Sequence, residues 1–355
     1  MDLNITWFLL VGVLIGGYAV LDGFDLGVGS LYPLLGKTEE QRLILLQSIG
    51  PFWDGNEVWL LTGAGAIFAA FPLVYASVFS GFYLAMMLVL LALILRVIAV
   101  EFRNQAETLE WRTRLDVLFF LGSFLPALLF GVAMGNIARG LPLNSAHYYT
   151  GGFFGLLNPY ALLIGFLGLF AFLLQGNSYV LLKTDGVLQE KARRLFLFIW
   201  ASCLTLYVLA SLYTYAAVPA LFANYQKYTW FLIAPLLSVV GLAAAPWLVK
   251  TARYGWALLA SSATMLGFIA TLGLGMYPSL VPALNPGLSL TIYNASSSAL
   301  TLKAMLIIAL TGMPIVLFYT IYVYRVFRGK VDIYGEGYSG KNNHGAWPPG
   351  GGIVR

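Results

Sequence analysis

The chain has 355 residues, of which 60% are hydrophobic and 10% are charged, with a net charge of +5 and a mean hydropathy of +0.82. These values exclude a soluble globular domain and give no reason to expect nucleic acid as a partner. Apolar segments of about 20 residues, each long enough to cross a hydrocarbon layer of roughly 30 Å, recur along the chain. We therefore predict an all-α, polytopic transmembrane helical bundle. It consists of one integral-membrane domain, residues 1–330, and a flexible cytoplasmic tail, residues 331–355.

Nine membrane-spanning segments follow one another, separated by short polar connectors. The first begins a few residues after Met1 with no basic leader and no small-residue cleavage site, so we interpret it as a span and not as a signal peptide. Between the first two spans, Thr38 and Gln41 have the spacing of a capping box that opens a short helix, although an ordinary connector fits equally well. The predicted spans are 5–30, 50–70, 76–100, 117–137, 157–180, 195–217, 229–248, 256–276 and 301–324.

The lysines and arginines predict the orientation, because cytoplasmic connectors of membrane proteins are enriched in them. If the N-terminus lies outside, 16 of the 20 fall in inner segments, while Arg139, Lys227 and Lys303 fall in outer segments and Arg96 lies within a span. We therefore predict about nine spans with the N-terminus outside and the C-terminus in the cytoplasm.

Five charged residues lie inside the predicted spans, namely Asp22, Asp25, Asp54, Glu57 and Arg96. A charge at the centre of a bilayer costs about 2.5 to 3.5 kcal/mol on insertion scales, so such residues usually face protein or water and mark a pathway. The predicted orientation places all five at a similar depth, toward the cytoplasmic side. Within each acidic pair the residues are three apart, which puts both on one face of a helix.

Two interpretations of these charges remain open at the level of sequence. They form structural salt bridges and helix caps, or they form a proton relay. The structural interpretation is weaker for the group than for any one residue, because four acids face one arginine. An acid beside Arg96 and an acid without a cation hold a proton with different affinities, as a relay requires. Asp54 and Glu57 are the better relay candidates, and Asp25 suits either role.

The sequence offers poor ligands for a redox cofactor. Buried haem needs axial ligands such as histidine, methionine or a thiolate, but His147 falls in a predicted outer loop and His344 in the tail. We find no Walker motif, dinucleotide fingerprint, nucleophile elbow or metal-ligand spacing. Redox chemistry is therefore predicted to belong to a partner, although contact with a haem edge or a quinone leaves no sequence signature.

Several long segments resemble subunit II of the cytochrome bd-type quinol oxidases. They are GYAVLDGFDLGVG, GPFWDGNEVWLLTGAGAIFAAFP, VYASVFSGFYLAMMLVLLALILR, HYYTGGFF with the following LLNPYALL, NASSSALTL and YTIYVYRVF. The resemblance covers nearly the full length of the chain and consists of unusual residue types in one order.

The resemblance implies nine spans and a heterodimer with subunit I, which carries all three haems, of types b and d, and the quinol site. The complex oxidises quinol, reduces dioxygen to water and takes up cytoplasmic protons in a bacterial or archaeal cytoplasmic (inner) membrane. Asp54 corresponds to an acid of the family's proton route, Asp25 to the acid of its GFD motif, Arg96 to the arginine that ends the third span, and Trp59 to a residue near a dioxygen entrance. No cofactor is expected on this chain, but a bound quinone or lipid and a small accessory subunit remain open.

One position departs from the family pattern, since Phe52 stands where some relatives have a histidine, so a protonatable role there is absent. The alternative function is a proton-coupled transporter that acts alone and uses the same acids to bind its coupling ion. Transporters often show repeated halves and broken helices near the midplane. This chain has its charges near one face and no visible repeat, so we favour the oxidase subunit.

Overall fold

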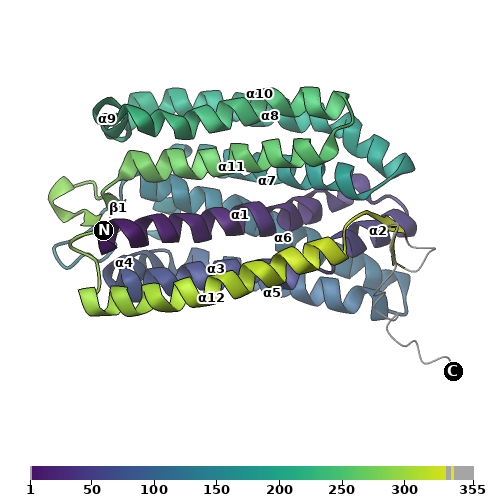
Figure 1. Ribbon diagram of the computed structural model, residues 1–355, viewed down its shortest axis with the longest axis horizontal. Coiled ribbons are helices and arrows are strands. Elements are labelled where there is room, and N and C mark those ends of the chain that lie inside the picture. The colour runs from purple at the N-terminus through teal and green to yellow at the C-terminus, as the bar shows by residue number, and fades with distance from the viewer. Residues whose placement is uncertain (1, 333–336, 340–355) are drawn as a thin grey trace.

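The computed structural model describes residues 2–332 and 337–339. Its long helices run side by side along one axis of the molecule (Figure 1). The helices are α1 (Leu3–Leu35), α2 (Glu39–Ile49), α3 (Trp53–Ala70), α4 (Pro72–Gly81), α5 (Tyr83–Phe102), α6 (Leu109–Arg139), α7 (Pro159–Lys183), α8 (Gly186–Ala217), α9 (Ala220–Lys227), α10 (Ile233–Lys250), α11 (Tyr254–Met276) and α12 (Ala299–Val326). The described residues also form two antiparallel strand pairs, β1 (Ser279–Val281) with β2 (Leu290–Thr291) and β3 (Lys330–Asp332) with β4 (Gly337–Ser339).

Nine crossings can be followed through the bundle, as the hydropathy pattern predicts. Eight of the described helices are long and apolar enough to span a membrane, namely α1, α5, α6, α7, α8, α10, α11 and α12. The ninth crossing is made by α3, which has 18 residues and lies along the same axis. Its first turns carry Asp54, Asn56 and Glu57, which shorten its apolar stretch.

Three predicted boundaries were wrong. The third span was placed at 76–100, but that range begins inside α4, and the crossing helix α5 begins at Tyr83. The fourth span was placed at 117–137, whereas α6 begins at Leu109 and extends the helix beyond the purely apolar stretch. The sixth span was placed at 195–217, whereas α8 begins at Gly186. The short helix α2 is present, and the Thr38 side chain accepts a hydrogen bond from the Gln41 amide, as the capping pattern predicts.

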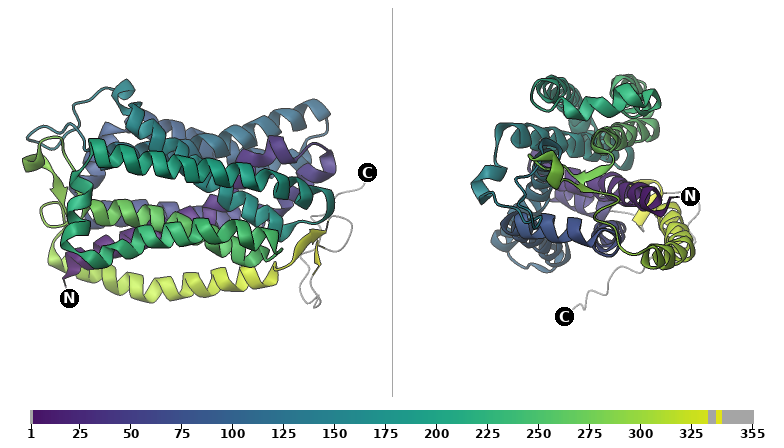
Figure 2. Two further views of the ribbon diagram at one scale, coloured as in Figure 1. Left: turned by 90° about the horizontal axis from the view of Figure 1, so that it is seen from above. Right: turned by 90° about the vertical axis from the view of Figure 1, so that its left-hand side faces the viewer.

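The helix α1 occupies the middle of the bundle, between a layer that contains α7 and α11 and a layer that contains α3 and α12 (Figures 1 and 2). Small residues allow this central position. A Cβ atom on Gly27 would overlap the carbonyl oxygen of Phe172 and lie 2.8 Å from the Cα of Gly176, so α1 and α7 cross with their backbones in contact. A Cβ atom on Gly29 would overlap the Ser123 side chain of α6.

The break between α3 and α4 is stabilised by the loop that precedes α12. Pro72 begins α4, where its missing amide proton costs no helical hydrogen bond. The last carbonyl groups of α3 need partners from outside the helix. Ser297 supplies them: its hydroxyl donates to Ala69 at 2.5 Å and its amide to Ala70 at 2.8 Å. The serine-rich NASSS segment thus ties the α12 loop to the end of α3.

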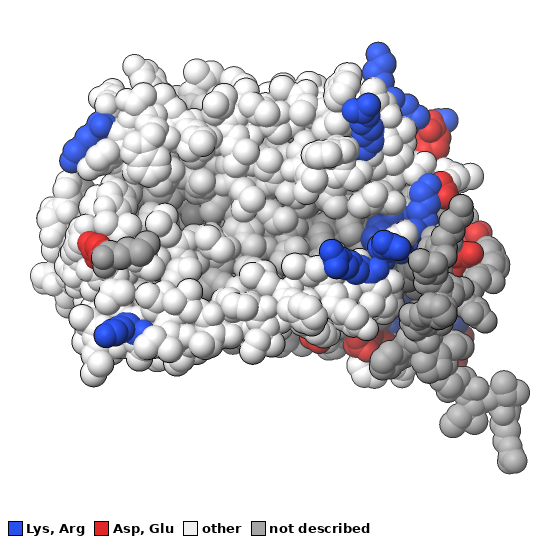
Figure 3. All heavy atoms as spheres, viewed as in Figure 1, with Lys and Arg blue, Asp and Glu red and all other residues white. Residues whose placement is uncertain are grey.

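Charged side chains gather at one end of the molecule (Figure 3). This end holds the connectors α1–α2, α5–α6, α7–α8 and α10–α11 and the end of α12, and the N-terminus lies at the other end (Figure 1). Near the charged end, Lys330 of β3 forms an ion pair with Asp185, the residue before α8. Most of the predicted flexible tail, 331–355, lies outside the described residues, while 331–332 and 337–339 belong to β3 and β4.

Candidate functional site

Three of the five predicted charges meet in one buried ion network. Arg96 of α5 donates from Nη2 and Nη1 to the two oxygens of Asp22 of α1, at 2.9 and 3.2 Å. Its Nη2 also donates to Glu57 of α3 at 2.6 Å. Arg96 is 1% exposed and Asp22 is fully buried, whereas the Glu57 side chain is 21% exposed. Two carboxylates therefore share one guanidinium, and Glu57 is the member of the network nearest to solvent.

The position of Arg96 depends on a close contact between α5 and α6. A Cβ atom on Gly122 would lie 2.6 Å from both the Ala92 carbonyl oxygen and the Arg96 amide nitrogen. Because Gly122 has no side chain, the two backbones approach each other and the Arg96 side chain turns toward α1 and α3, where its carboxylate partners lie.

Asp25 is fully buried one turn beyond Asp22, but its hydrogen bonds go elsewhere. Its Oδ2 accepts from the Asn56 amide at 2.8 Å, and the same amide donates to the Leu21 carbonyl at 3.2 Å. Its Oδ1 has no hydrogen-bond partner among the described residues. Buried polar atoms are rarely left in this state. Asp25 is thus a fully buried acid that has no ion-pair partner among the described residues.

An aromatic cluster lies next to Asp25 and Asn56. Tyr324 of α12 donates a hydrogen bond to Asn56 Oδ1 at 3.1 Å. The Tyr324 ring packs against Phe52 with a centroid distance of 4.5 Å, and the Phe24 ring stacks on Tyr179 at 4.0 Å. Lys183, at the end of α7, places its ammonium group 5.2 Å from the centre of the Phe52 ring. Phe52 is thus a packing residue of this cluster.

The structure does not join Asp54 to the buried network. Asp54 is exposed on α3, on the same face as Val58 and Leu61. Within the described part of the chain, no residue forms a hydrogen bond or ion pair with its carboxylate. Trp59, by contrast, is buried, and a Cβ atom on Gly17 of α1 would overlap its indole ring.

A second charged cluster was missed by sequence reasoning. Asp116 of α6 is buried and accepts hydrogen bonds from Tyr32 at 2.7 Å, Arg103 at 2.5 Å and Arg42 at 3.0 Å. Arg103 also pairs with Glu39 of α2 at 3.0 Å. The cluster therefore joins α1, α2, α6 and the turn after α5. Asp116 stands one residue before the predicted fourth span, so it was assigned to a connector.

The described residues do not fit an axial haem site. His147 lies in the loop after α6, where its Nδ1 is 3.2 Å from the Leu288 carbonyl oxygen. No group of three or more histidine, cysteine or acidic residues that could hold a metal ion occurs in the described ranges. His344, the other histidine, lies outside those ranges.

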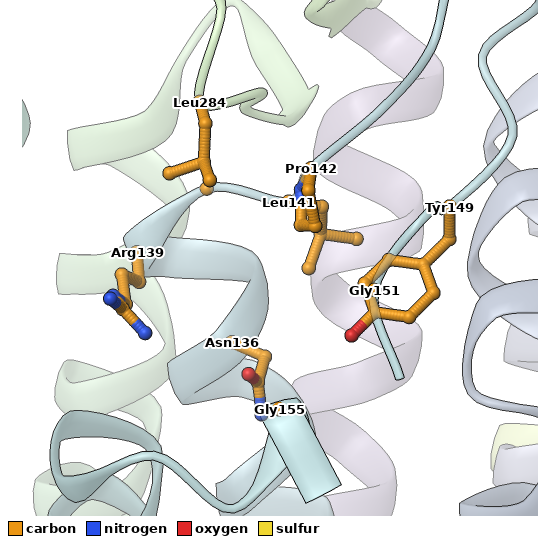
Figure 4. A pocket seen from close by; sticks show the side chains of 9 residues that line it. Asn136, Arg139, Leu141, Pro142, Tyr149, Gly151, Gly155 and Leu284 are labelled. Carbon is orange, nitrogen blue, oxygen red and sulfur yellow. The ribbon is translucent and has the colours of Figure 1, made fainter. Parts of the chain in front are cut away.

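A cavity of about 140 Å³ lies beside the C-terminal end of α6, and Figure 4 shows the side chains that line it. Asn136, Arg139 and Tyr149 line it together with backbone of the loop after α6. Tyr149 donates its hydroxyl proton to the Gly152 carbonyl at 3.2 Å, and Asn136 is held by the Leu156 carbonyl. Asn136 and Tyr149 are thus engaged in holding the loop.

The fold and the buried network define the class of this protein: a polytopic helical membrane protein with ionisable groups enclosed between its central helices. More particularly, the chain belongs to the family described as cytochrome bd terminal oxidase subunit II, whose model matches residues 3–327. The resemblance inferred from the sequence is therefore confirmed.

Curated relatives match along nearly the whole chain. It is 38% identical over 372 residues to the probable cytochrome oxidase subunit 2 of Haemophilus influenzae, covering 96% of this chain and 98% of that protein. It is 38% identical over 360 residues to the cytochrome bd-I ubiquinol oxidase subunit 2 of Escherichia coli K12, covering 93% and 95%. It is 36% identical over 333 residues to the cytochrome bd ubiquinol oxidase subunit 2 of Bacillus subtilis, covering 93% and 97%.

A solved structure shows the same fold. A chain of the bd oxidase from Geobacillus thermodenitrificans superposes with a TM-score of 0.74 at 20% identity, covering 92% of this chain and 99% of that chain. The protein is accordingly a multi-pass membrane subunit of a bacterial respiratory oxidoreductase complex, in which it pairs with subunit I.

Proposed function

We propose that this chain is the haem-free subunit of a quinol:dioxygen oxidoreductase and that its buried acids carry protons from the cytoplasm toward subunit I. The observation that supports this most is the charge balance of the Arg96 network. One guanidinium contacts two carboxylates, Asp22 and Glu57, so the three groups together have room for one further proton. A purely structural pair needs one acid for each base.

The charged end of the bundle faces the cytoplasm in this proposal. The bias of lysine and arginine toward that end supports the orientation. The route then begins at the exposed Asp54, continues one turn along α3 to the partly exposed Glu57, and ends at the buried Asp22, which shares the Arg96 guanidinium with Glu57. Asp25 holds a proton beside this route, with Asn56 as its hydrogen-bond donor.

The partner holds the haems of types b and d, which transfer electrons from quinol to dioxygen when bound. The family name supports haem in the complex, and the poor fit of the described residues to axial ligation supports its placement on subunit I. The complex lies in the cytoplasmic (inner) membrane. A bound quinone or lipid and a small accessory subunit remain predictions.

Trp59 lines an apolar path for dioxygen in this proposal. Its ring packs on Gly17, and α3 continues beyond it with the small residues Gly63 and Ala66. Such a surface suits an apolar gas. The alternative of a transporter that acts alone has no specific support in the site, and membership of the oxidase family favours the respiratory complex.

The test is Asp54→Asn in the purified complex with subunit I, with the haem content measured by optical spectroscopy. If Asp54 admits protons, oxygen consumption falls by at least about tenfold while the haem content stays normal, as expected when a general acid–base group is lost. Normal turnover in a haem-replete complex would eliminate an obligatory route through Asp54.

A further inference from the structure

Tyr324 is a polar residue beside the proposed proton route that the route itself does not use. It lies near the end of α12, and its hydroxyl donates to Asn56 Oδ1 at 3.1 Å across 268 residues of sequence. Its ring is seated between aromatic neighbours, with centroids 4.5 Å from Phe52 and 6.4 Å from Phe24. Packing of the ring therefore holds the hydroxyl in place, and the hydroxyl contacts Asn56, the residue that donates a hydrogen bond to Asp25.

The hydrogen bond determines how the Asn56 amide is turned. When Tyr324 donates to Oδ1, the two Nδ2 protons are left for Asp25 Oδ2 at 2.8 Å and the Leu21 carbonyl at 3.2 Å. All three contacts agree with one orientation, in which Asp25 receives an N–H donor. Without the hydroxyl, Asn56 Oδ1 loses its donor, and only the two contacts of Nδ2, to Asp25 and Leu21, oppose rotation of the amide, which would present its oxygen to Asp25 instead.

The same contact connects Asp25 to the least embedded helix of the bundle. Leu302 is the one fully buried residue of α12. Polar contacts hold this helix near its two ends. Near its start, the Trp7 indole donates to the Leu302 carbonyl at 2.9 Å. Near its other end, Tyr324 contacts Asn56, and Lys183 donates to the Phe327 carbonyl at 2.6 Å. A displacement of α12 would therefore change the hydrogen bond between Tyr324 and Asn56.

We propose that Tyr324 is a positioning residue for Asp25: it orients the Asn56 amide so that Asp25 is always offered a hydrogen-bond donor. This inference deepens the proposed proton function and rests on it for its effect on turnover. The contact also makes the hydrogen bonding of Asp25 depend on the position of α12.

Tyr324→Phe in the complex with subunit I tests the proposal, because phenylalanine keeps the ring packing and removes the hydroxyl alone. Tyr322→Phe is the matched control, since Tyr322 lies on the same helix and is 59% exposed. We expect normal haem content in both variants. Turnover should fall by about three- to tenfold in Tyr324→Phe, the range for loss of one hydrogen bond, and stay unchanged in Tyr322→Phe.

A second measurement is the infrared carbonyl band of Asp25, which is identified as the band that disappears in Asp25→Asn. If Tyr324 had only a structural role, its substitution would leave the frequency of this band unchanged. The band should shift in Tyr324→Phe and stay in place in Tyr322→Phe. An unmoved band together with normal turnover would overturn the proposal. If Tyr324→Phe does not assemble, 3-fluorotyrosine is introduced at position 324, because it keeps a hydroxyl but changes its strength as a hydrogen-bond donor. A shifted Asp25 band then supports the proposal, and an unchanged band overturns it.

Two further variants separate this inference from the proposed function. In an Asn56→Leu background, Tyr324→Phe should have no additional effect, because the amide through which it acts is gone; an undiminished additional loss would contradict the inference. If Asp25→Asn retains full turnover, the part of the proposed function that concerns Asp25 fails. The infrared shift would still decide whether Tyr324 positions Asn56.

Discussion

Arg96 and Asp22 form a bidentate ion pair in the core of the bundle, with distances of 2.9 and 3.2 Å between the guanidinium nitrogens and the carboxylate oxygens. Both side chains are removed from solvent. Neither charge could be placed there alone, because the cost of an unpaired buried ion exceeds what packing can offset. The pair also brings Arg96 within reach of Glu57, so an interaction that stabilises the fold shapes the proposed proton site.

Removal of the arginine should destabilise the subunit strongly. We expect Arg96→Leu to cost about 3 to 5 kcal/mol, the range for a buried ion pair that loses one partner. The measurement is the thermal stability and yield of the complex with subunit I. Arg114→Leu is the control, since Arg114 pairs with Glu110 on an exposed helix face.

A second substitution checks the cause of that loss. Adding Asp22→Asn to Arg96→Leu should recover part of the stability, because one uncompensated buried charge is removed. A double variant that is less stable than Arg96→Leu alone would show that the loss has another origin.

The contact of α1 with α7 gives a prediction about packing. Gly27→Ala places a methyl group where the Phe172 carbonyl oxygen already lies, so we expect a loss of about 1 to 3 kcal/mol from overpacking. Gly12→Ala is the matched control on the same helix, because a Cβ atom at Gly12 meets nothing within 4 Å. Equal melting temperatures for the two variants would contradict the close crossing.

Much of this bundle follows from the sequence, because length and apolarity suffice to identify a membrane-spanning helix. The grouping of the charged residues at one depth, with Arg96 as a charge partner, was also predicted, since each charge needs a partner in the apolar phase; the sequence left open which acids pair with Arg96. The wrong boundaries lie where hydropathy is a poor guide. The sequence stays apolar across the break at Phe82, between α4 and α5. In contrast, α6 continues into polar sequence and buries Asp116.

The finer features of the site could not be predicted in this way. Tyr324 and Asn56 are separated by 268 residues, and neither one stands out as a charge within an apolar stretch. Their contact depends on how α12 lies against α1 and α3, which is a tertiary property. The exposure of Asp54 also depends on the rotation of α3 about its axis, because one turn of the helix separates it from the partly buried Glu57.

Cysteine labelling tests the proposed orientation. The single native cysteine, Cys203, is fully buried and gives little background. We expect Leu284→Cys, near the end of the molecule that holds the N-terminus, to react with a membrane-impermeant maleimide applied to the outer side of spheroplasts. Val187→Cys, at the charged end, should react only after the membrane is opened. Both native side chains are more than half exposed. The opposite labelling pattern would show that the orientation in the membrane is the reverse of the proposed one, and the direction of the proposed proton route would be reversed with it.

Proton uptake during dioxygen reduction shows whether the buried acids carry protons; it is followed with a pH-indicator dye enclosed on the cytoplasmic side of vesicles that contain the haem-replete complex. We expect Asp54→Asn to slow uptake by at least about tenfold, and Asp54→Glu, which keeps a carboxyl group, to restore most of the rate. Uptake at the unaltered rate in Asp54→Asn, with normal haem content, would rule out the proposed route.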